Sequence, residues 1–279
     1  IFFRVLSSGA MMAASNAETT AAAEQASDPD IVEELQALRL GAPPSPASSA
    51  RPPPLRVALR IVNNAHAPTE GSVWLLEEVG AAQVHAMTHA FYKKAFADPH
   101  LTRFFRDKTD PHAERLANWI VEKMGGGSPW TSERRTRPQK VVALAGGHKH
   151  VVHDRSSAHV AAWYAPAREP EKVGQHFQLD DSRVWMRLMF WAAREAGLLR
   201  HPHFADWYVR FIGHFVRVYE RKAPAFARES MRWSEEAARP AAYEAAGRRM
   251  PDVVGVTPTE ALKQLPPEER HDGAWPYEL

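Results

Sequence analysis

The sequence contains no cysteine in its 279 residues. This absence excludes disulfide bonds, zinc sites with thiolate ligands, iron–sulfur clusters and a cysteine nucleophile. No apolar run approaches the ~20 residues that a membrane-spanning helix needs. The formal net charge is only +2, which is too small to attract nucleic acid or an anionic membrane surface strongly. We therefore expect no nucleic-acid partner and no membrane partner.

The sequence also lacks the motifs of several enzyme classes and of targeting segments. The three glycines from Gly125 follow an apolar helical pattern rather than precede one, which is the wrong context for a phosphate-binding loop. The opening IFFRVL is too short for the core of a signal peptide, and the acidic residues that follow argue against a transit peptide. We expect a cytoplasmic protein, with organellar targeting left open because the chain begins with Ile1 rather than Met.

Composition divides the chain into three parts. Residues 1–70 are predicted to form a disordered, low-complexity extension, because the stretch GAPPSPASSARPPP (41–54) has too many prolines for helix or strand. Residues 71–229 carry the dense apolar and aromatic content of a single ligand-holding domain. Residues 230–279 are predicted to be a C-terminal extension that docks in part on this domain, around Trp233.

Helical periodicity dominates the middle of the chain. Apolar residues recur at helical spacing over residues 84–95 and again over 111–124, where glycines end the pattern. The clearest predicted helices are one around Trp185 and one over 204–218. No run of useful length alternates with period two, so we predict an all-α fold, with residues 131–150 as a polar, glycine-containing loop.

Four segments, in this order, resemble the motifs of truncated haemoglobins, the compact globins with a two-over-two helical sandwich. FYKKAFADPHLTRFF (91–105) resembles the B-helix motif, and HAERLANWIVEKMGGGSPW (112–130) resembles the E helix with its closing glycines. DRSSAH (154–159) resembles the segment that ends in the proximal histidine, and SRVWMRLM (182–189) resembles the G helix of the group II branch. The resemblance implies a globin-like two-over-two helical sandwich that holds haem b, whose iron a histidine ligates.

The resemblance also implies roles for individual pocket residues. Tyr92 matches the tyrosine that donates a hydrogen bond to the iron-bound ligand, and Phe105 matches the phenylalanine that packs on the porphyrin. Trp185 matches the G-helix tryptophan, whose indole N–H is a donor that can reach bound O₂. The other predicted pocket residues lie on the segment that resembles the E helix: His112, Leu116, Trp119 and Ile120.

Two histidines compete for the proximal position. His159 follows the small residues Ser157 and Ala158, as a closely packed haem face requires, and it best fits the family motif. His176, in GQHFQLDD, lies nearer in sequence to Trp185, which matches the usual short connection to the G helix. We favour His159 as the iron ligand, keep His176 as the alternative and regard His153 as a weaker third candidate.

The resemblance implies a haem-binding globin that reversibly binds O₂, and also NO or CO. NO dioxygenation, or another redox role, would need a reductase partner, because the chain carries no flavin or nicotinamide motif. Whether the protein is an enzyme is left open. The alternative from another class is a haem-free helical interaction module that keeps the globin fold.

A third, weaker hypothesis is a zinc or copper site made by His148, His150 and His153. Imidazole is a ligand of both metals. However, the run lies beside glycines and has no carboxylate or thiolate nearby to complete a ligand set. A solvated loop is therefore favoured over a metal site.

Overall fold

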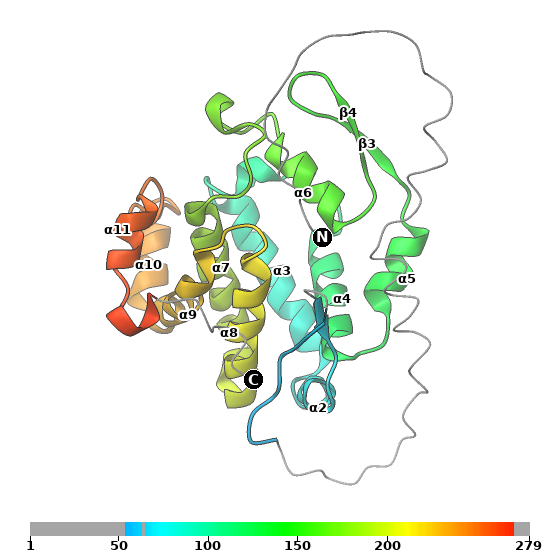
Figure 1. Ribbon diagram of the computed structural model, residues 1–279, viewed down its shortest axis with the longest axis vertical. Helices are drawn as coiled ribbons and strands as arrows, with labels where there is room; N and C mark the ends of the chain where they lie inside the picture. Colours follow the sequence, from blue (N-terminus) through cyan, green and yellow to red (C-terminus); the bar gives the residue numbers. More distant parts are fainter. Residues whose placement is uncertain (1–53, 63–64, 271–279) are drawn as a thin grey trace. The chain divides into compact units, whose positions relative to one another are not determined.

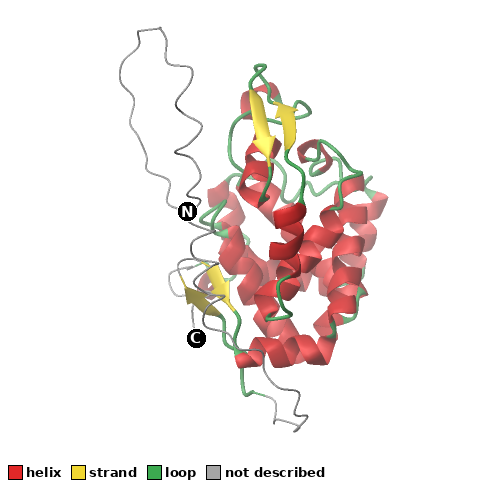
Figure 2. Cartoon of the chain, turned by 90° about the vertical axis from the view of Figure 1, so that its right-hand side faces the viewer, coloured by secondary structure: helices red, strands yellow, loops and turns green. Residues whose placement is uncertain are grey.

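The computed structural model describes residues 54–62 and 65–270 (Figure 1). The described chain is mostly helical, which is consistent with the predicted all-α class, and Figure 2 shows helices as its bulk. The α-helices are α2 (Glu70–Val79), α3 (Ala81–Ala97), α4 (His112–Met124), α5 (Pro129–Thr136), α6 (Arg155–Trp163), α7 (Leu179–Glu195), α8 (Pro202–Val216), α9 (Ala227–Glu235), α10 (Ala238–Ala245) and α11 (Pro258–Lys263). None of the helices in the described part combines the length and apolar character needed to cross a bilayer.

Local chemistry accounts for the helix ends that position the later site. Asp98 and the following Pro99 end α3, since proline disfavours helical backbone in the residue before it. Gly125 ends α4 in a left-handed conformation, with φ of 100°. A Cβ atom at Gly125 would lie 2.5 Å from a methyl carbon of Val73, so only glycine fits here.

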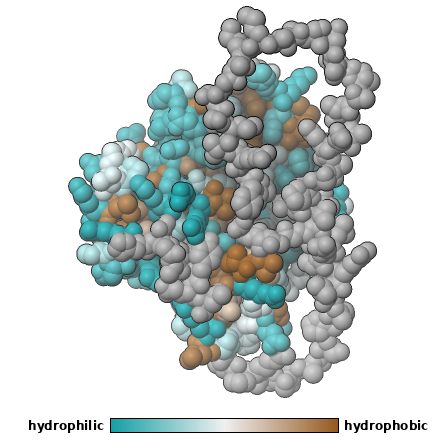
Figure 3. Space-filling view, in the orientation of Figure 1, coloured by the Kyte–Doolittle hydropathy of each residue, from teal (hydrophilic) through white to brown (hydrophobic). Residues whose placement is uncertain are grey.

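The core forms where α3 packs against both α4 and α7, and α7 also packs against α9. Several of the largest fully buried apolar side chains lie on α3, α7 and α8, among them Phe91, Phe190 and Trp207. Burial of each such side chain contributes roughly 1.5–3 kcal/mol of hydrophobic free energy. On the face shown in Figure 3, the apolar side chains that reach the surface form small patches among hydrophilic ones.

Two short antiparallel hairpins correct the prediction for two segments. The segment 131–150, predicted as a loop, instead contains most of α5 and strand β3 (Lys140–Ala143), which pairs with β4 (Lys149–Val152). Gly146 and Gly147 adopt positive φ in the turn, which is why this turn can be tight. The strands are four residues long and have apolar residues on both faces, so they show no useful alternation.

The second hairpin lies within residues 1–70, the predicted disordered extension. Residues 1–53 lie outside the described residues, but β1 (Arg60–Val62) pairs with β2 (Ala65–Ala67). Val57 and Leu59 are buried in the core, and so is His66. The apolar anchors therefore begin well before Ser72, where the helical periodicity starts.

We expect His66 to make folding stability depend on pH. Burial lowers the pKa of His66 to about 4, and its imidazole packs against Trp207 and Phe211. Because the unfolded chain has a histidine pKa near 6.5, it binds more protons than the folded chain between pH 6.5 and pH 4. Stability therefore falls as the pH falls through that window, by ~2 kcal/mol at pH 5.

Urea unfolding at pH 7 and pH 5 measures this effect. In a His66→Phe variant, which keeps an aromatic ring at this place, the loss between the two pH values should be smaller by ~2 kcal/mol. An identical loss in the variant and the wild-type chain would contradict the assignment.

Candidate functional site

A cavity of about 550 Å³ lies among the helices and the β3–β4 hairpin. Its volume falls within the ~300–1,000 Å³ typical of small-molecule sites. All seven residues predicted to contact a cofactor line this one cavity, and so does the favoured ligand His159. They are Tyr92 from α3, Phe105 after the short helix 102–104, His112, Leu116, Trp119 and Ile120 from α4, Trp185 from α7, and His159 from α6.

Tyr92 lies in an aromatic cluster on the cavity wall. Its ring packs edge-on against Phe105 at a centroid distance of 5.8 Å and nearly parallel to His112 at 5.4 Å. Burial raises the pKa of the Tyr92 hydroxyl above its usual range, so it stays a neutral donor. No described residue accepts its hydrogen bond, which leaves the O–H available to a ligand in the cavity.

His112 also lines the cavity, but one of its nitrogens is already committed. Its Nε2 lies 2.8 Å from the carbonyl oxygen of Asp107, and only a protonated nitrogen can donate to a carbonyl. Burial lowers the pKa of His112, which favours the neutral ring. The neutral ring stacks on Tyr92 and orients it, and only Nδ1 remains as an acceptor.

Trp185 reaches the cavity from α7. Its ring packs edge-on against Phe91, at 5.4 Å between centroids, and Phe91 is fully buried. No described residue accepts a hydrogen bond from the Trp185 indole N–H. Tyr92 and Trp185 are therefore neutral donors on the cavity wall, and the two helices that carry them pack on each other.

His159 lies in a different aromatic environment, on α6. Its ring packs edge-on against Phe177 at 5.5 Å and Tyr219 at 4.9 Å. Its Nδ1 is buried without a hydrogen-bond partner, and no described residue bonds its Nε2. Burial lowers the pKa of His159 to about 3. The imidazole is therefore neutral near pH 7, the form that ligates a metal.

The helix that carries His159 is fixed at both ends. Asp154 caps its start by accepting a hydrogen bond from the Ser157 amide at 2.7 Å. Arg106 holds its other end by donating from Nε to the Ala161 carbonyl at 2.9 Å and from Nη2 to the Tyr164 carbonyl at 2.7 Å. A cation at a helix C-terminus also complements the helix dipole.

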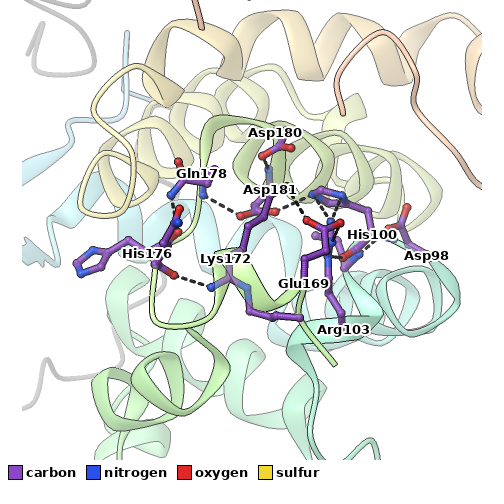
Figure 4. Close-up of polar contacts among 12 residues, drawn as sticks. Asp98, His100, Arg103, Glu169, Lys172, His176, Gln178, Asp180 and Asp181 are labelled. Carbon is purple, nitrogen blue, oxygen red and sulfur yellow. Dashed lines mark hydrogen bonds and ion pairs between the residues drawn. The ribbon is translucent and has the colours of Figure 1, made fainter. Parts of the chain in front are cut away.

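The alternative ligand, His176, does not line the cavity. Its ring is exposed and stacks on Trp163, with centroids 4.0 Å apart and planes 11° from parallel. Figure 4 shows its imidazole pointing away from the polar network around Asp181. The geometry thus separates two histidines that the sequence left in competition.

Several charged side chains line the cavity, and most of them are paired. Lys140 bonds Asp107 at 2.7 Å, and Glu133 holds Arg115 and Arg137. Arg155 differs, because it forms no ion pair with a described carboxylate. Its guanidinium instead lies 5.0 Å from the Trp119 ring centroid. Arg155 is therefore the cation best placed for an anionic group of a ligand, a role that the sequence analysis did not assign.

Other lining residues were also missed as site residues. They are mostly apolar or aromatic and include Phe177, Ser182, Met189, Tyr208, Ile212, Phe215 and Tyr219. The helix predicted over 204–218 contains Tyr208, Ile212 and Phe215, but periodicity cannot tell a residue facing a cavity from one facing solid core.

The structure does not gather the histidines of the 148–153 run into a metal site. His150 Nε2 donates to the Ser157 carbonyl at 2.9 Å, while His148 and His153 are exposed. Among described residues, the group with ligand-like spacing is His100, Asp180 and Asp181. There, His100 donates its Nε2 proton to Asp181 at 2.7 Å and accepts a bond from Arg103 at Nδ1, so both nitrogens are committed.

The arrangement can therefore hold a largely apolar ligand. It presents that ligand with the unpartnered His159 imidazole, the Tyr92 and Trp185 donors, and Arg155, a cation without an ion pair among the described residues. Scans of family models, curated proteins and solved structures gave no match to this chain.

Proposed function

We propose that this chain is a haem-binding globin of the truncated, two-over-two type, similar to group II, which binds O₂ reversibly. The observation that carries the proposal is the His159 imidazole, which is neutral and has no hydrogen-bond partner among the described residues. It lines the cavity that also holds the Tyr92 and Trp185 donors. Haem, when bound, supplies the iron that takes up O₂, NO or CO.

The cavity residues fit a haem group. The lining is dominated by aromatic and aliphatic side chains, which suits a flat apolar macrocycle. His159 would hold the iron, and Arg155 on the cavity lining would pair with a propionate carboxylate. In one respect the fit departs from common metal sites, because His159 Nδ1 has no described acceptor to orient the ring. The edge-on contacts with Phe177 and Tyr219 orient it instead.

The two donors define what the cavity does to a small ligand. A diatomic ligand with partial negative charge is stabilised by the Tyr92 O–H and the Trp185 N–H, since hydrogen bonds strengthen where water is excluded. Such a site retains O₂ and slows its release. NO dioxygenation would add a redox role, and its turnover would need a reductase partner.

An absorption titration tests the proposal directly. Adding haem to the purified chain should give a Soret band that saturates at one haem per chain. If no band forms, the haem proposal fails, and the haem-free interaction module becomes the better interpretation.

Tyr92→Phe should speed O₂ release from the haem-loaded protein. The variant keeps the ring contacts with Phe105 and His112 but removes the donor, and loss of one such bond costs ~1–3 kcal/mol, or roughly 5- to 150-fold in the dissociation rate. Stopped-flow displacement of O₂ by CO measures this rate. Tyr219→Phe, which removes a hydroxyl beside His159 instead, should leave it nearly unchanged. Equal rates in all three proteins would show that Tyr92 does not contact the ligand.

A further inference from the structure

We propose that Tyr243 in the C-terminal segment is a positioning residue for the cavity wall, acting through Asp98. The inference deepens the proposed function, because it identifies what holds the wall against a bound ligand. The segment comprises α9, α10 and α11, and α9 packs along α7, the helix that carries Trp185 (Figure 1).

Tyr243 makes a buried contact over a long sequence separation. Its hydroxyl donates to Asp98 Oδ2 at 2.8 Å, and both side chains are almost inaccessible to solvent. The Tyr243 ring packs edge-on against Trp191 of α7 and Trp233 of α9. The ring is thus wedged between two helices while its hydroxyl reaches the end of a third.

Asp98, which Tyr243 holds in place, in turn fixes the turn that follows α3. Its Oδ1 accepts hydrogen bonds from the amides of His100 at 2.8 Å and Leu101 at 2.7 Å. Its other oxygen, Oδ2, accepts the Tyr243 bond. Loss of the tyrosine hydroxyl would leave that oxygen buried without a described partner, and an unpaired buried acceptor is costly. The carboxylate would then rotate or bind water, and its hydrogen bonds to the His100 and Leu101 amides would weaken.

The same turn is tied to the start of α7. His100 donates its Nε2 proton to Asp181 Oδ1 at 2.7 Å, and Asp181 Oδ2 accepts from the Gln178 amide at 2.8 Å (Figure 4). Asp181 therefore caps α7 while it holds His100 in place. A continuous set of buried hydrogen bonds runs from Tyr243 through Asp98 to this cap.

The turn forms part of the cavity wall. Leu101, Phe104 and Phe105 line the cavity, and Asp181 lines it as well. Phe105 also contacts the Tyr92 ring. Tyr243 touches no ligand itself, but the residues that it holds through Asp98 shape the wall beside the Tyr92 donor.

Hydrogen exchange on the haem-free chain tests this coupling without relying on haem binding. In Tyr243→Phe, exchange of the His100 and Leu101 amides should become about tenfold faster, the equivalent of one lost buried hydrogen bond. The matched control is Arg232→Gln, which breaks the Arg232–Glu269 pair inside the C-terminal segment. That control should leave the two amides unchanged.

Two outcomes would overturn the proposal. One is unchanged exchange at His100 and Leu101 in Tyr243→Phe. The other is faster exchange of the same size throughout α8, which would indicate only a general loss of stability. A second readout uses the haem-loaded chain, where Tyr243→Phe should raise the rate of CO release severalfold. If wild-type chain takes up no haem, the proposed function fails while the exchange measurement still decides the role of Tyr243.

Discussion

Replacing His159 by alanine is expected to abolish the Soret band that the wild-type chain forms with added haem. His159 is the described histidine on the cavity lining that has both nitrogens free of hydrogen bonds. The other histidine on the lining, His112, has its Nε2 committed to the Asp107 carbonyl. With alanine at position 159, the described lining keeps only the His112 imidazole, whose Nε2 is committed and whose ring stacks on Tyr92. Haem would then be held mainly by apolar contacts.

The control for this experiment is His176→Ala. Because the His176 ring stacks on Trp163 and lies outside the cavity lining, its removal should leave the Soret band at wild-type intensity. Added imidazole should restore a band in His159→Ala, which would show that the cavity itself is intact. A band lost only in His176→Ala would assign the ligand to His176 and contradict the structural placement.

Replacing Glu229 by alanine is expected to lower the free energy of unfolding by about 3 kcal/mol. The carboxylate of Glu229 bonds Arg187 Nη2 at 2.5 Å, and Asp252 bonds Nη1 at 2.7 Å. The Arg187 side chain is only 2% exposed. Removal of Glu229 leaves this buried charge with one partner that is itself half exposed, which is the costly case for a buried ion pair.

Urea unfolding followed by circular dichroism measures the change. The matched control is Glu235→Ala, which breaks the solvent-exposed pair between Glu235 and Arg194 and should cost less than about 1 kcal/mol. The double variant Arg187→Met with Glu229→Leu should recover much of the loss, because it removes the buried charge as well. Similar losses for Glu229→Ala and Glu235→Ala would mean that the burial of Arg187 does not matter.

The sequence predicts the helices of the domain well where local chemistry sets their ends. Asp98-Pro99 and Gly125 act through backbone sterics, which depend on a few neighbouring residues. The β3–β4 hairpin was not predicted, because its sequence shows no alternation of apolar and polar residues. Its strands face the cavity on one side and solvent on the other, and valines occupy both sides, as with the exposed pair of Val141 and Val151.

For the candidate site too, some features could be predicted from the sequence and others depend on tertiary packing. Motif order was enough to select eight residues that the fold brings to one cavity, although they come from separate segments between residues 92 and 185. That His159 lines the cavity and His176 does not could be seen only in the structure, where the His176 ring stacks on Trp163. Arg155 was missed because its lack of a carboxylate partner is a tertiary property.

The C-terminal segment was the hardest part to predict. Arg187 lies on a face of α7 that a helical wheel places toward solvent, since arginine is rarely buried. The structure covers that face with α9 and supplies Glu229 and Asp252 as partners. A buried arginine and an exposed one look alike in a single sequence, so periodicity underestimates how much of α7 is covered.

The three hydrogen bonds that Arg106 donates to backbone carbonyls have a consequence for the synthesis of the protein. Its guanidinium bonds carbonyls that lie 37, 55 and 58 residues further along the chain. At a translation rate of roughly 5–20 residues per second, the last of these acceptors follows Arg106 out of the ribosome by about 3–12 s. During that interval α3 and α4 can pair, but the face of α3 that packs on α7 stays exposed to water, because α7 follows later in the chain. Nascent chains paused in this window would therefore be natural clients for chaperones that recognise exposed aromatic surface.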